Sequence, residues 1–166
     1  MIRLALVIVF LTFPFCSIAE NTFPAPFGLS WNMSEGDLKA VGFSHVTESG
    51  GFELYSSVSV PKAWSKGDTY LAIVYNGTLV KLAANSIHFT DDIYGTEGKG
   101  AYNQIKKLLI EKYGQPSNQL ERIGLSLYDD SDEFYQCLEY SGCGVYSTIF
   151  EFEGGTIGVT LNGVRR

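Results

Sequence analysis

The sequence is poor in the residues on which most enzymes and metal proteins depend. It has only two histidines, His45 and His88, and three cysteines in 166 residues. Zinc sites need several histidine or cysteine ligands. Calcium sites need a particular spacing of oxygen ligands, which the acidic run Asp129, Asp130, Asp132 and Glu133 does not have. No G-x-S-x-G turn and no P-loop occurs. The sequence therefore predicts no metal, no cofactor and no catalytic residue.

Positive charge is also scarce. The chain has 12 Lys and Arg against 18 Asp and Glu, which gives a formal net charge of -6. Nucleic acid and anionic lipid attract basic proteins, so neither is expected as a partner. The expected partner is another protein, and the net charge favours a basic one. A modest negative charge also keeps a small exported protein soluble, and that simpler interpretation stays open.

Long hydrophobic runs are confined to the N-terminus. Arg3 precedes a mostly apolar stretch from Leu4 to Phe13, and Ser17-Ile18-Ala19 has the small-x-small pattern of a cleavage site. The stretch is too short to span a bilayer and is typical of a secretory signal peptide. We expect residues 1–19 to be removed and residues 20–166 to form one periplasmic or secreted domain, with no membrane insertion after cleavage.

Cleavage after Ala19 removes Cys16 and leaves Cys137 and Cys143 as a pair. Disulfides persist outside the cytoplasm, so we expect these two cysteines to be joined. Five residues separate them, between two strand-like runs, which predicts a bridge across a β-hairpin with Tyr140 in its loop. Lipid modification of Cys16 is the alternative, but bulky residues stand where a lipobox needs small ones.

The first part of the exported chain combines a short helix with strands. Ser34 and Asp37 form a capping-box pattern that predicts a helix over residues 35–41. Residues 52–60 alternate with a period of two and predict a half-buried strand, with Tyr55 on the side opposite the apolar set. Asn76-Gly77 separates two apolar runs and is typical of a tight hairpin turn. One more strand is expected over residues 86–90.

The second part is expected to begin with the longest helix of the exported chain. Apolar residues at helical spacing predict it, with Gly114 and Pro116 as its stop signal. They are Ala101, Ile105, Leu108 and Leu109. Gly95 to Gly100 are interpreted as a flexible entry loop, and strand-like runs follow at 123–127, 134–140, 145–152 and 156–164.

This order of elements predicts the fold class. Strands grouped between helices, without a β-α alternation, favour an α+β fold in which an antiparallel sheet carries a short and a long helix on one face. Both parts place a helix before strands, so a pseudo-duplicated α-β layout is an alternative that the sequence leaves open.

Two short stretches resemble a group of small bacterial envelope domains. The segment Phe27–Ser34, followed by Leu38 and Val41-Gly42, is similar to the opening of the β-lactamase-inhibitor-protein-like and small outer-membrane-assembly lipoprotein families. Glu111–Pro116 is similar to the helix ends of such domains. The resemblance implies a helix-on-antiparallel-sheet domain that binds proteins in the periplasm without a cofactor.

The leading hypothesis is an exported protein-binding module without catalytic activity: an inhibitor, an immunity-type protein or an envelope-assembly factor. Aromatic residues dominate binding hot spots, and acidic residues suit a basic partner. The candidates are Tyr140, Tyr135, Tyr55, Trp64, Asp130 and Asp132. One alternative is a small envelope hydrolase that uses His88 or His45 with Asp91 and Asp92. A purely structural envelope component is another.

Overall fold

The structure is a computed structural model that describes residues 24–124, 128 and 130–163. Its first elements are η1 (Pro26–Gly28), α1 (Glu35–Ala40), β1 (Ser44–Ser49), β2 (Phe52–Ser57), β3 (Gly67–Tyr75) and β4 (Thr78–Ser86). They are followed by α2 (Thr96–Tyr113), β5 (Asn118–Ile123), η2 (Ser131–Glu133), α3 (Phe134–Glu139), β6 (Gly144–Phe152) and β7 (Gly155–Leu161). In this described part, no helix has the length and apolar character that crossing a membrane requires.

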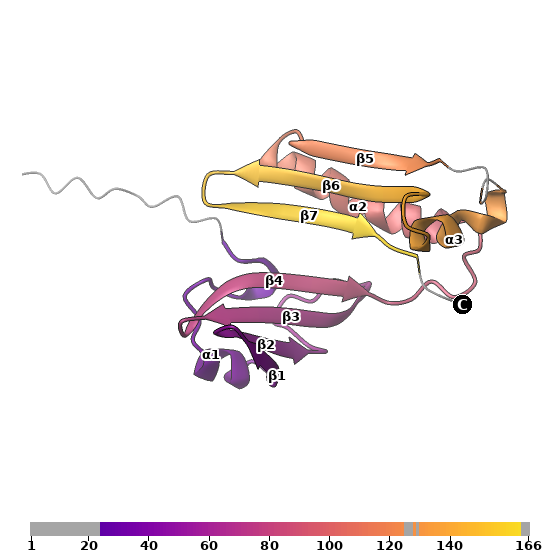
Figure 1. Ribbon diagram of the computed structural model, residues 1–166. Coiled ribbons are helices and arrows are strands. Elements are labelled where there is room, and N and C mark those ends of the chain that lie inside the picture. The colour runs from indigo at the N-terminus through magenta and orange to yellow at the C-terminus, as the bar shows by residue number, and fades with distance from the viewer. Residues whose placement is uncertain (1–23, 125–127, 129, 164–166) are drawn as a thin grey trace, which may run out of the picture.

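The strands form two antiparallel sheets, where the sequence predicted one. Strands β1 to β4 pair in chain order in a four-stranded sheet, and β5 to β7 pair in a three-stranded sheet. Figure 1 shows the two sheets apart, with β4 and β7 at the edges that face each other and α2 behind the three-stranded sheet. The α+β class is confirmed. We call residues 24–86 the first half, 96–163 the second half and 87–95 the linker.

Helix α1 begins as the sequence predicts. The side chain of Ser34 accepts a hydrogen bond from the Asp37 N–H, and the Asp37 carboxylate accepts one from the Ser34 N–H at 2.9 Å. A helix of six residues is not stable alone, so packing must hold it. The Leu38 side chain supplies that packing, since it is completely buried in the core of the first half. That core consists of Leu29, Leu38, Phe43, Tyr55, Val60, Tyr70, Ala72, Val74 and Leu79.

The predicted Asn76-Gly77 turn is confirmed. Both residues have positive φ, 49° and 73°, and the turn joins Tyr75 of β3 to Thr78 of β4. The strand expected over residues 86–90 is wrong, because β4 already includes Ser86 and ends there. Strand β1 was not predicted from the sequence. It carries His45. All six β1 residues are exposed, so the strand has no apolar alternation to reveal it.

Helix α2 begins earlier than its apolar pattern indicates. Its first residue is Thr96, so the residues interpreted as a flexible entry loop form the N-cap and first turn. Gly95, at φ 69°, packs against the ring of Phe134, where an added Cβ would lie only 2.1 Å from a ring atom. Gly114 ends the helix as predicted, at φ 83°. Gly95 therefore serves close packing, whereas Gly100 has open space around it.

The buried side of α2 differs from the predicted stripe. Gly98, Ala101 and Tyr102 are its buried residues, whereas the side chain of Leu108 is 58% exposed. The hydroxyl of Tyr102 is hydrogen-bonded to the buried hydroxyl of Thr148 on β6. Burial is the main cause that raises the pKa of Tyr102, to about 12. The helix therefore turns a partly polar side toward the sheet.

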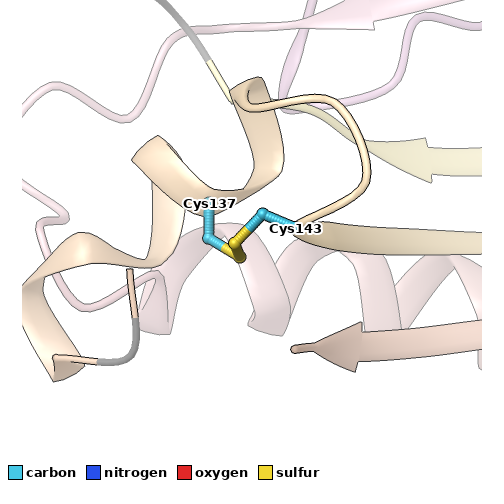
Figure 2. The surroundings of a disulfide bond; sticks show 2 residues. All are labelled: Cys137 and Cys143. Atoms are coloured by element: carbon cyan, nitrogen blue, oxygen red, sulfur yellow. A yellow bond between two sulfur atoms is a disulfide. The ribbon is translucent and has the colours of Figure 1, made fainter. Parts of the chain in front are cut away.

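Residues 134–139 form helix α3, and the strand predicted there is wrong. Phe134 and Cys137 are both buried, three residues apart, as on one side of a helix. A short apolar run fits either a helical or a strand period, so only packing decided between them. The predicted disulfide is present: Cys137 on α3 is joined to Cys143 just before β6, with 5.1 Å between their Cα atoms. Figure 2 shows that the bridge ties a helix to the start of a strand, and not two strands of a hairpin.

Candidate protein-binding face

The four-stranded sheet has one side that packs on the core and one that does not. Tyr55 of β2 is paired with Ala72 of β3, and both are completely buried. Alternate residues along a strand point to opposite sides. Phe52 and Leu54 of β2 therefore lie on the side away from the core. Within the apolar set of residues 52–60, the members on β2 therefore face away from the core, whereas Val60, beyond the strand, is buried in it.

We call the side away from the core the open face. Its members are the residues that the strand register places opposite one another on that side. They are Ser44, Thr47, Ser49, Phe52, Leu54, Ser56, Thr69, Leu71, Ile73, Tyr75, Thr78, Lys81, Ala83 and Asn85. None of these described residues belongs to the buried core cluster of the first half.

Two aromatic side chains stand at one end of the open face. Phe52 and Tyr75 are cross-strand partners whose rings stack with 4.5 Å between centroids and 24° between planes. Their side chains are 49% and 41% exposed. Phe52 follows the turn between β1 and β2, and Tyr75 precedes the Asn76-Gly77 turn. The rings are therefore held by the sheet register and still accessible from outside.

The centre of the open face is apolar and nearly free of charge. Leu54 lies opposite Ile73, and Leu71 lies opposite Ala83, all of them half-buried. Among the described paired positions of this face, Lys81 is the one charged side chain. Contiguous apolar surface of this kind is typical of interaction sites.

The three-stranded sheet also has a covered and an uncovered side. Helix α2 covers the side on which Tyr146 and Thr148 lie, because Tyr102 contacts both residues. The opposite side, which we call the outer side, carries alternate residues of the same strands. They are Asn118, Leu120, Arg122, Val145, Ser147, Ile149, Glu151, Thr156, Gly158 and Thr160.

A small cavity lies between the two halves. It has about 50 Å³ and is lined by Trp64 of the first half and by Tyr102 and Leu161 of the second. The backbone N–H of Trp64 donates a hydrogen bond to the hydroxyl of Tyr70, a residue of the first core, at 2.9 Å. Thr160 of the outer side also lines the cavity, whereas no described position of the open face does.

Two of the predicted binding residues are engaged inside the molecule. Tyr55 is completely buried and its hydroxyl donates a hydrogen bond to Glu53, so as an exposed anchor it is a wrong prediction. Burial, with the carboxylates of Glu53 and Glu35 beside it, raises the pKa of Tyr55. Trp64 is half-buried and lines the cavity between the halves.

The other predicted binding residues lie at the α3 end of the second half. Tyr135 is half-buried and donates a hydrogen bond to Asp92, whereas Tyr140 is 48% exposed with its ring 5.6 Å from that of Tyr128. Asp130 and Asp132 are exposed. The structure therefore brings none of the six candidates onto the described positions of the open face.

The residues of the hydrolase alternative lie in two places, one of them on β1 and the others in the linker. His45 lies on β1 with its ring edge-on to that of Tyr55, and His88 lies in the linker; both are exposed. Asp91 is exposed in the linker as well. Within the described residues, no group of three or more His, Cys, Asp and Glu side chains is placed to hold a metal ion.

Asp92 has a structural role at the start of α2. Its Oδ2 accepts hydrogen bonds from the Gly98 N–H and the Tyr135 hydroxyl, each at 2.8 Å. Burial acts to raise the pKa of this carboxyl, but these two bonds and the N–H groups of Thr96 and Glu97 outweigh it and hold the pKa below its usual range. Asp92 therefore joins the linker to both helices of the second half.

Sequence reasoning did not find Phe52 and Tyr75 as surface anchors. The period of two in residues 52–60 was recognised, but the side with more apolar residues was assigned to the core. On β3 both sides are apolar, because Tyr70, Ala72 and Val74 alternate with Leu71, Ile73 and Tyr75. The Asn76-Gly77 turn signalled that Tyr75 stands at a strand end, and that was the available clue.

Comparison with known proteins adds no relative. The chain matches no protein-family model, and no curated protein or solved structure matches it. The resemblance of residues 27–34 and 111–116 to envelope domains therefore stays a prediction, and the function has to be argued from the open face.

Proposed function

We propose that the chain is an exported protein-binding module without catalytic activity, and that the open face is where its partner binds. The observation that carries the proposal is the stacked pair Phe52 and Tyr75, exposed at the end of an apolar sheet surface. Aromatic residues of this kind supply most of the binding energy at protein interfaces. The signal-like N-terminus and the disulfide support export.

A protein fits the open face better than a small molecule does. Small-molecule sites are concave and enclose roughly 300 to 1,000 Å³. The cavity between the halves has about 50 Å³ and is lined by none of the described positions of the open face. A sheet surface with half-buried aliphatic residues and a protruding aromatic pair matches the apolar centre of a protein interface instead.

The test is capture of the partner with matched variants. The purified protein is immobilised, and binding of envelope proteins is compared for wild type, for F52S/Y75S and for the control I87S/L108S. Ile87 in the linker and Leu108 on α2 are exposed apolar residues, 46% and 58%, and neither belongs to the four-stranded sheet. We expect F52S/Y75S to lose about tenfold or more in affinity for the captured protein, as loss of interface anchors does, and the control to bind like wild type.

Unfolding curves of both variants show whether a loss of binding comes from loss of fold. Equal stability and equal binding of F52S/Y75S and wild type would remove the open face as the site. Equal loss in both variants would show that exposed apolar surface anywhere on the molecule produces the capture.

A further inference from the structure

We infer that the open face selects a protein surface that is apolar and nearly uncharged, although the net charge of the chain favours a basic partner. The inference rests on the proposed function, because it names the chemistry of the partner that would occupy the same face.

The uncovered sides of the two sheets carry few charges. Lys81 lies on the open face, and Arg122 and Glu151 lie on the outer side. These are the charged residues at the described paired positions of the two surfaces. Their sum is slightly positive, on a chain whose formal net charge is -6. The acidic excess of the protein is therefore located elsewhere.

Most acidic residues near the sheets lie on the covered side or in loops. Glu48 and Glu53 are cross-strand partners on the same side as Tyr55, away from the open face. Glu121 lies on the covered side of the second sheet, where it forms an ion pair with Lys106 of α2. Asp130 and Asp132 are exposed near α3. A basic partner drawn by the net charge would meet these regions first.

The sheet itself separates this acidic charge from the open face. Alternate residues point to opposite sides of a sheet, so the carboxylates of Glu48 and Glu53 do not lie over Leu54. Glu121 is ion-paired with Lys106, which offsets its charge. Binding there depends on burial of Phe52, Leu54, Ile73 and Tyr75, which salt screens very little.

The open face also disfavours a basic partner directly. A lysine or arginine laid over Leu54 and Ile73 would lose its hydration, and none of the described strand partners of these two residues is a carboxylate. The carboxylate of Asp68 accepts a hydrogen bond from Thr69, at the end of the face away from Tyr75. Burying a charge without a partner is strongly unfavourable. Apolar and aromatic partner residues carry no such penalty.

A random peptide library displayed on phage tests the inference with a defined probe. The library is selected on immobilised wild-type protein after removal of all phage that bind F52S/Y75S. We expect the enriched peptides to be rich in aromatic and aliphatic residues and to have little net charge. Their affinity should change less than about twofold between about 50 mM and about 500 mM salt, because burial of apolar surface carries it.

Enrichment of peptides rich in lysine and arginine, with affinity that falls steeply with salt, would overturn the inference and leave the open face as the binding site. Failure to enrich any peptide that prefers wild type over F52S/Y75S would instead count against the proposed function. A further control is the oligomeric state of the purified protein. A dimer that F52S/Y75S abolishes would identify a second copy of the chain as the occupant and would overturn both.

Discussion

The two halves of the molecule share a plan and differ in how they are stabilised. Each places a helix before antiparallel strands. The first half has a helix of six residues and a core made almost wholly of apolar side chains. The second half has a helix of eighteen residues, a disulfide and a buried hydroxyl pair between Tyr102 and Thr148.

This difference shows that a small sheet can be secured either by apolar burial or by links between its elements. In the first half, β3 has apolar residues on both sides of the sheet, and β2 adds Phe52 and Leu54 to the side away from the core, so one apolar side stays open. In the second half, nearly every residue of β5 is exposed, and fewer apolar side chains are available. The disulfide and Asp92 provide links where apolar burial is thinner.

The largest effect is expected from removal of a core side chain in the first half. L38A deletes a completely buried side chain and leaves a cavity, so the free energy of unfolding should fall by about 2 to 5 kcal/mol. The control L108A truncates a side chain that is 58% exposed and should change stability far less. Urea unfolding of the three proteins measures both. Equal changes would contradict the assignment of α1 as a packed element.

The next effect is expected from the disulfide and should be confined to the second half. For so short a ring, C137A/C143A should lower the free energy of unfolding by about 2 to 2.5 kcal/mol. Native-state hydrogen exchange should show weaker protection in β6 and α3 and unchanged protection in β3. Loss of protection in β3 as well would mean that the halves unfold as one unit and would break the comparison.

A smaller effect is expected from Asp92, and it should depend on pH. Hydrogen bonds hold its pKa low in the folded protein, so the ionised carboxylate adds stability above the unfolded pKa, near 4. That stability is lost as pH falls through the lower folded pKa. D92N should therefore be less stable than wild type at pH 7, by about 1 to 2 kcal/mol, and the two should converge in acid. Parallel pH profiles of the two proteins would contradict this role.

Local signals in the sequence predicted local structure well. The capping box of Ser34 and Asp37, the Asn76-Gly77 turn and the glycine stop of α2 at Gly114 all specify backbone conformations within a few residues. The cysteine pair was also predicted, because the even number of cysteines left after cleavage and their short separation can be read without knowing which helix or strand carries each one. The predicted site residues are distributed differently from the proposed site, since none of the six is among the described positions of the open face.

Burial could not be read from the same patterns. Tyr55 and Phe52 belong to one strand, three residues apart, and the side of that strand with more apolar residues is not the side that packs on the core. The run 134–140 fitted a strand until the burial of Phe134 and Cys137 on one side placed it in a helix. In each case the neighbours in space, and not those in the chain, made the choice.

The sequence by itself determined where this chain turns, where its helices start and stop, and that two cysteines remain for a bridge. These features depend on backbone dihedral angles and hydrogen bonds between residues a few positions apart. Only the tertiary structure decided that the strands form two sheets, that Tyr55 is inside and that Phe52 and Tyr75 are outside. The physical reason is that a strand with apolar residues on both sides has no inward side until another element packs against it.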